Sequence, residues 1–403
     1  MACRITNRTG VSRATPPDIF SNHSILCMGM FTRAVNNSAK WLGMNSICLD
    51  AFVPFDLKRM ADQAVQLTDQ ETIIFDEKTH EFSEDFRKIS IETIQSKITQ
   101  YSQYLPNARF DYVYPDSFLF DDPEFRKILV EIPGFVQKID QHKISFYDTF
   151  IESLQEKRKI SKNKLNLSIL VLYDTINLIV LSISKAINCP FEDEHDSVVN
   201  MDRIVTNESI QEYPIDESKI KYLSSLCDKI GLIGIVEFRF QSDTWNEIND
   251  DNINEIFPYL NASSLELFES ATGLNLLTID LEIHECKRIP RYVFEEEFQT
   301  RLMNGFNKGF SWAFYRFFTP VRFAIFAELG GYDFRDSPMP GTIMRINDPI
   351  SSEIVDFNQL NETQETGIKC FNSIDSVTER YQSERELLFK VLGVKKYIEK
   401  YYS

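Results

Sequence analysis

The chain has 403 residues and is 43% hydrophobic, which is enough for two or three domains with packed cores. Its net charge of -17 argues against a nucleic-acid partner, because phosphate binding requires clustered Lys and Arg. Seven scattered cysteines without a CxxC pair, and five histidines without ligand-like spacing, disfavour a zinc site and favour a reducing compartment. We therefore expect a cytoplasmic protein.

Residues 1–23 contain no apolar stretch long enough for a secretory signal, so we interpret them as a loose tail. An Arg-rich organellar presequence is the alternative for this segment. The first folded unit is predicted over residues 24–130. It opens with a strand at Ser24–Gly29, a helix at Arg33–Leu42 and a strand at Ser46–Asp50, which together predict a βαβ unit.

Gly29 in the first turn and Asp50 at the end of the second strand are two features of a dinucleotide-binding turn. In such a turn the acid binds a ribose hydroxyl. The residues after Gly29 do not complete a GxGxxG motif, so the signal is weak. An NAD-binding oxidoreductase stays open as a minor alternative.

Spacing further along the chain predicts mostly helices, followed by a β-hairpin. We expect an amphipathic helix at 83–105, a strand at 111–114, a single connecting helix at 117–130 and a helix from about 143 to 158. The long apolar stretch at 165–187 contains several polar residues and is divided by Tyr173-Asp174-Thr175, so it predicts a hairpin and not a membrane span. We therefore expect no membrane partner.

Two glutamates, Glu237 and Glu255, lie in neighbouring apolar runs with the alternation of β-strands. If the chain turns back between the runs, the strands are antiparallel and the two carboxylates face one site among apolar neighbours. Such a pair suits Mg²⁺ holding nucleotide phosphates. An ordinary hairpin with solvated carboxylates is the alternative.

The segments Gly234-Ile-Val-Glu-Phe238, Glu255-Ile-Phe-Pro258 and Ala271-Thr-Gly-Leu-Asn275 resemble the last strands and the following helix of the ATP-grasp superfamily, particularly carboligases related to biotin carboxylase. Thr32-Arg33 with Asp50-Ala-Phe52 resembles the preATP-grasp domain of the same carboligases. The resemblance implies an α/β and α+β protein: a Rossmann-like preATP-grasp domain, then a shortened ATP-grasp core with an antiparallel sheet over 131–290. A C-terminal module would occupy 291–403, including a hook at 338–350, a strand at 320–327 and a terminal helix at 374–402.

The same resemblance implies ATP and Mg²⁺ as cofactors, with Glu237 and Glu255 as metal ligands and Lys143 as a nucleotide-binding lysine. A solvated lysine at a helix start is the alternative for Lys143. Phe257 stands where the family has a metal-binding Asn, and Tyr259 where it has an Arg. No glycine lies between Gly134 and Gly231, so the Gly-rich loop that folds over the phosphates is missing.

The implied activity is ATP-dependent ligation of a small-molecule carboxylate to an amine or thiol through an acylphosphate. No catalytic residue is identified from the sequence. The alternative is an inactive paralogue that serves as a ligand-binding or protein-interaction subunit, with a protein partner or a homodimer as its assembly. The missing Asn, Arg and glycine positions favour this alternative.

Overall fold

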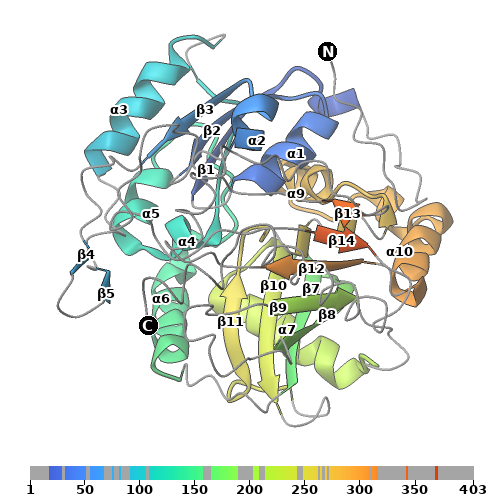
Figure 1. Ribbon diagram of the computed structural model, residues 1–403. Coiled ribbons are helices and arrows are strands. Elements are labelled where there is room, and N and C mark those ends of the chain that lie inside the picture. The colour runs from blue at the N-terminus through green and yellow to red at the C-terminus, as the bar shows by residue number, and fades with distance from the viewer. Residues whose placement is uncertain are drawn as a thin grey trace, which may run out of the picture.

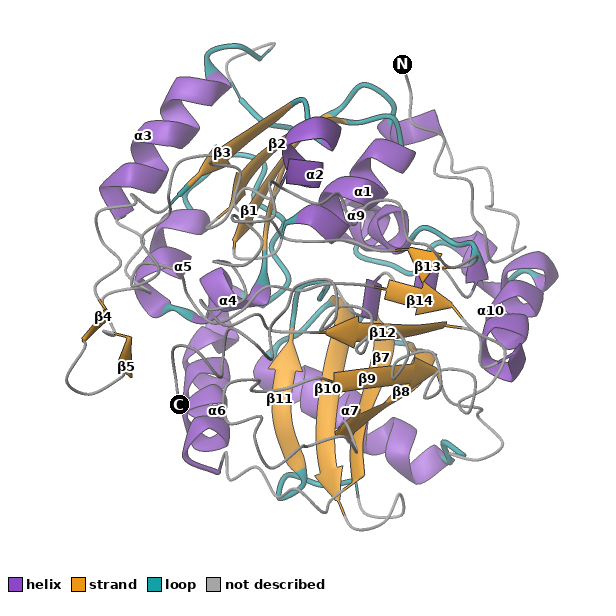
Figure 2. Cartoon of the chain, in the orientation of Figure 1, coloured by secondary structure: helices purple, strands orange, loops and turns teal. Residues whose placement is uncertain are grey.

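The structure is a computed structural model of the whole chain. It describes residues 18–29, 32–50, 55–67, 75–76, 81–82, 91–105, 109–157, 165–188, 203–207, 214–242, 248–261, 264–265, 268–269, 272–308, 311–315, 342–343 and 368–370. Two sheets dominate the described part of the chain, one parallel and one antiparallel, with helices around and between them (Figures 1 and 2). No helix within these ranges is long and apolar enough to cross a membrane.

The N-terminal sheet is parallel and has the strand order β3-β2-β1-β6. Strand β1 is buried along its whole length because it lies between two neighbours and beneath helix α1. This confirms the predicted βαβ unit. The elements of this unit and its surroundings are η1 (Asp18–Phe20), β1 (Ser24–Gly29), α1 (Arg33–Trp41), β2 (Asn45–Asp50), α2 (Phe55–Met60), β3 (Gln63–Gln66), β4 (Phe75–Asp76), β5 (Glu81–Phe82), α3 (Ile91–Ser102) and β6 (Tyr112–Pro115).

The expected single helix at 117–130 is wrong, because two helices occupy this range: α4 (Ser117–Asp121) and α5 (Pro123–Leu129). Asp122 separates them in an extended conformation and caps α5 by accepting hydrogen bonds from the backbone N–H groups of Glu124 and Phe125. Pro123 has no N–H to donate, so it ends one helix and begins the next.

The second sheet is antiparallel throughout, with the strand order β11-β10-β7-β8-β9-β12-β14-β13. The predicted hairpin at 165–187 is confirmed as β7 and β8, which turn at Asp174–Asn177. Its strands are β7 (Leu165–Tyr173), β8 (Leu178–Asn188), β9 (Arg203–Asn207), β10 (Gly234–Ser242), β11 (Ile253–Phe257), β12 (Ser311–Tyr315), β13 (Thr342–Ile343) and β14 (Ile368–Cys370).

Helices tie this sheet to the N-terminal unit. Helix α6 packs against β11 and α7, whereas α9 contacts both β10 and α1 and so joins the two sheets (Figure 1). The helices of this half are η5 (Gln141–Lys143), α6 (Ile144–Lys157), α7 (Glu217–Ile230), α9 (Leu276–Cys286), η6 (Arg291–Phe294) and α10 (Glu296–Lys308). The predicted hook apart from β13, the strand at 320–327 and the helix at 374–402 lie outside the described residues.

Candidate functional site

A row of polar residues crosses the antiparallel sheet at one level. Glu255 on β11 lies opposite Arg239 on β10, which lies opposite Ser168 on β7, which in turn lies opposite Ser184 on β8. Side chains alternate between the two faces of a strand, so Arg239 shares its face with Glu237, two residues earlier. The two predicted glutamates therefore lie on adjacent antiparallel strands, as expected. Arg239 lies directly opposite Glu255 and two residues after Glu237 on the same strand.

Glu237 is buried, with 2% of its surface exposed, and its carboxylate accepts hydrogen bonds from three side chains. Oε1 accepts from Ser168 Oγ at 2.7 Å and from Arg239 Nε at 2.8 Å, and Oε2 accepts from Ser264 Oγ at 2.6 Å. The residues directly opposite Glu237 on both neighbouring strands are apolar, as expected, and the three side chains supply the donors that a carboxylate needs there. A buried carboxylate needs such donors, because its desolvation would otherwise cost several kcal/mol.

Arg239 joins the two glutamates. Its Nε donates to Glu237, and its Nη1 donates to Glu255 Oε2 at 2.9 Å. The guanidinium carbon also lies 4.3 Å from the centre of the Phe257 ring, which is a cation–π contact. A cation that pairs with both carboxylates is thus supplied by the chain itself.

These residues, as they stand, do not fit a magnesium ion. Mg²⁺ demands near-octahedral oxygen coordination, whereas here a guanidinium group occupies the space between the carboxylates and Phe257 offers no oxygen. Across the residues that the structure describes, no group of three or more His, Cys, Asp or Glu side chains could hold a metal ion. The assignment of Glu237 and Glu255 as metal ligands stays a prediction, and the hydrogen bonds of Arg239 to both carboxylates argue against it.

Lys143 forms its hydrogen bond with the C-terminal end of helix α7. Its ammonium group donates to the backbone carbonyl of Asp228 near the end of α7, and its side chain packs beside Gly231. This carbonyl also accepts from the backbone N–H of Gly231, the C-cap of α7, and a cation at this end of the helix complements the helix dipole. The structure thus brings Glu237 and Glu255 together, whereas the contact described for Lys143 is with α7.

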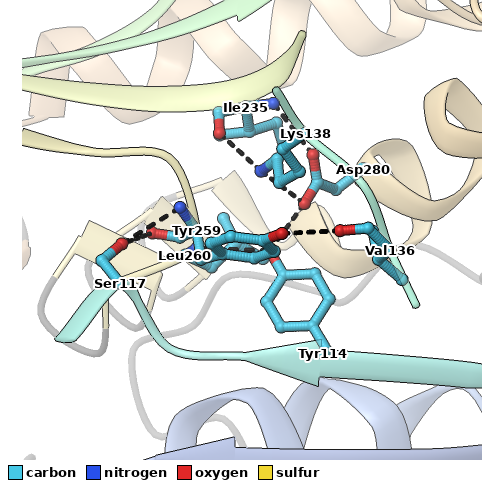
Figure 3. A network of polar contacts seen from close by, with 8 residues as sticks. All are labelled: Tyr114, Ser117, Val136, Lys138, Ile235, Tyr259, Leu260 and Asp280. Carbon is cyan, nitrogen blue, oxygen red and sulfur yellow. Dashed lines mark hydrogen bonds and ion pairs between the residues drawn. The ribbon is translucent and has the colours of Figure 1, made fainter. Parts of the chain in front are cut away.

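Tyr259, the residue at the expected Arg position, is fully buried and donates its hydroxyl to the Val136 carbonyl at 2.7 Å. It belongs to a network that sequence analysis missed (Figure 3). At its centre, Lys138 Nζ donates to Asp280 Oδ2 at 2.7 Å and to the Ile235 carbonyl at 2.6 Å. The only local signal for this pair is one charged residue within each of two apolar runs.

The network joins the two sheets through Asp280 on α9. Asp280 Oδ2 also accepts from the Tyr114 hydroxyl on β6 at 2.6 Å, and Oδ1 accepts from the Ile235 N–H on β10 at 2.9 Å. Burial raises the pKa of Tyr114, and the neighbouring Asp280 raises it further. Burial lowers the pKa of Lys138, against the opposing effect of Asp280. The Lys138–Asp280 ion pair therefore has a structural role at the junction of the two sheets.

Asp50, the acid on which the dinucleotide-binding alternative rests, is hydrogen-bonded to Thr32 at the start of α1. It is 2% exposed, and its Oδ2 accepts from Thr32 N at 2.8 Å and from Thr32 Oγ1 at 2.7 Å. These bonds hold the residue that precedes the first turn of α1 against the end of β2. The NAD-binding alternative gains no support from this geometry.

Comparison with known proteins gives matches in structure only. No family model matches the sequence, and no curated protein matches it either. Among solved structures, the biotin carboxylase domain of a single-chain bacterial carboxylase matches over 90% of this chain and 88% of its own, with a TM-score of 0.51 and 12% identity. The biotin carboxylase of Campylobacter jejuni matches over 89% and 90%, with a TM-score of 0.51 and 12% identity.

A third structure, the ADP complex of purK, N5-carboxyaminoimidazole ribonucleotide synthetase, matches over 94% of this chain and 99% of its own, with a TM-score of 0.51 and 11% identity. The chain has the fold of the ATP-grasp carboxylases. The predicted fold class, with a parallel and an antiparallel sheet, is therefore confirmed. At this level of identity the ATP-grasp likeness concerns the fold alone.

Exchanging each glutamate for glutamine is expected to have unequal effects. Glu237→Gln weakens charge-assisted bonds to buried donors, so we expect a loss of about 2 kcal/mol in the free energy of unfolding. Glu255→Gln, the matched control, affects a side chain that is 27% exposed and should cost less than about 1 kcal/mol. Urea unfolding followed by circular dichroism measures both, and equal losses would contradict the hydrogen-bond geometry described here for the two glutamates.

Proposed function

We propose that this chain is a catalytically silent protein of ATP-grasp fold, which binds a ligand or another protein subunit and is not a magnesium-dependent ligase. One observation carries the proposal: Arg239 pairs with both Glu237 and Glu255. The fold supports an ATP-grasp origin, and the altered site supports the loss of ATP-dependent chemistry.

The charges at the site explain why a triphosphate is disfavoured. Phosphoryl transfer needs positive charge aimed at the phosphate oxygens, which metal ions, Lys and Arg usually supply. Two carboxylates and one guanidinium leave this cluster with a net negative charge when no metal enters. Such a cluster repels phosphates, and Lys143, the one predicted phosphate-binding lysine, bonds to a carbonyl of α7.

The competing function is the ligase that the fold suggests, which would use ATP and Mg²⁺ to join a small-molecule carboxylate to an amine or thiol. Isothermal titration with ATP and ADP, with and without Mg²⁺, separates the two. We expect no heat of binding at millimolar nucleotide and no phosphate release. Magnesium-dependent binding in the micromolar range, roughly -8 kcal/mol, that is lost in Glu255→Gln would instead establish the ligase site.

Two kinds of binding partner are compatible with this proposal. One is a small molecule, and the other is a protein, which includes a second copy of the chain. Light scattering after gel filtration gives the mass of the purified protein and so tests the homodimer directly.

We also assign the protein to the cytoplasm, with support from its thiols: Cys27 and Cys48 lie opposite each other on β1 and β2 and are both free.

A further inference from the structure

On the basis of the silent site described above, we propose that Arg239 is a built-in cation that keeps a latent divalent-metal site closed. The latent site consists of Glu237 and Glu255, with the hydroxyl groups of Ser168 and Ser264 beside them. According to this proposal, the residue at position 239 alone determines whether the site binds a metal ion.

The two atoms that accept hydrogen bonds from Arg239 are carboxylate oxygens. Its Nε and Nη1 lie 2.8 Å from Glu237 Oε1 and 2.9 Å from Glu255 Oε2, so both carboxylates point at one small group. Hard divalent cations such as Mg²⁺ and Mn²⁺ prefer carboxylate and other oxygen ligands. Without the guanidinium, two carboxylates would face the same space with no cation between them, and their mutual repulsion would favour binding of such an ion.

Arg239 is held firmly enough to exclude a competing ion. Two carboxylates fix the edge of its guanidinium, and the Phe257 ring lies against it at 4.3 Å. A guanidinium group stays charged at any pH at which the protein is folded, so the site cannot be opened by deprotonation. A lysine at this position would keep the charge but lose the two-nitrogen geometry.

The test is binding of Mn²⁺ alone, without nucleotide, followed by electron paramagnetic resonance of the free ion. Arg239→Met removes the charge and keeps an unbranched side chain, and we expect it to bind Mn²⁺ at least tenfold more tightly than the wild type. Arg239→Lys is the matched control and should bind no better than the wild type. Adding Glu255→Gln to Arg239→Met should abolish the gained binding.

Binding by Arg239→Met no tighter than by the wild type would overturn the proposal if the variant has the wild-type circular dichroism spectrum. If Arg239→Met does not fold, the wild type and Glu255→Gln decide: Mn²⁺ bound by the wild type and lost in Glu255→Gln overturns the proposal, and no binding by either supports it. Nucleotide is absent throughout, so these results are independent of whether the wild-type protein turns over ATP. ATP turnover by the wild type would contradict the proposed function separately.

Discussion

Replacing Lys138 by methionine is expected to lower the free energy of unfolding by about 3–5 kcal/mol, because it leaves the Asp280 carboxylate buried without its cation. Lys138 and Asp280 are 2% and 0% exposed, so water cannot replace the lost partner. The Ile235 carbonyl would lose a hydrogen bond in the same change. Guanidinium chloride unfolding, followed by circular dichroism and by tyrosine fluorescence, measures the loss.

The double variant Lys138→Met with Asp280→Leu is the control for this prediction. It removes both charges, so we expect it to be more stable than Lys138→Met alone. It still leaves the Tyr114 hydroxyl and the Ile235 N–H without their acceptor, so full recovery is not expected. A single variant as stable as the wild type would show that the ion pair does not hold the two sheets together.

Replacing Gly234 by alanine is expected to cost at least about 2 kcal/mol. Gly234 has a φ of 96°, where L-residues are strained, and an added Cβ would lie 2.6 Å from Asp280 Oδ1 and 2.9 Å from Lys138 Cε. The new methyl group would therefore push apart the two partners of the buried ion pair. Thermal unfolding and denaturant unfolding of the variant both measure this effect.

Gly43 offers a matched control in the turn between α1 and β2. Its φ is 75°, but the nearest atom to an added Cβ would be Ser21 Oγ at 3.4 Å, which is an ordinary contact. Gly43→Ala therefore carries only the backbone strain, about 1–2 kcal/mol. If Gly43→Ala and Gly234→Ala were equally destabilising, crowding at the ion pair would not explain the cost at Gly234.

Local sequence patterns predicted the parts of the fold that depend on neighbouring residues. The alternation of residues in 165–187 predicted the hairpin, and the strand–helix–strand order at the N-terminus predicted the βαβ unit. The single helix predicted at 117–130 was wrong, because the early acids and late basic residues of this range fit one helix as well as two, whereas Asp122-Pro123 breaks it.

The candidate site was only partly predictable, because its chemistry depends on register between strands. The two glutamates could be placed on adjacent strands, and Arg239 follows Glu237 by two residues on the same strand, but its pairing with Glu255 depends on the register of β10 against β11, which a sequence does not show. The Lys138–Asp280 pair joins residues 142 positions apart and has no local partner pattern at all. Long-range polar pairing of this kind becomes visible only in three dimensions.

The order of strands in the antiparallel sheet also constrains how the chain can be shortened. Strand β7 pairs with β8 immediately after it, but its other edge is covered by β10, which the ribosome makes only after β9 and α7. Until then the apolar strand Leu165–Tyr173 presents an open edge, and open apolar edges promote aggregation. A fragment that ends before Ser242, the last residue of β10, is therefore expected to aggregate through this edge of β7.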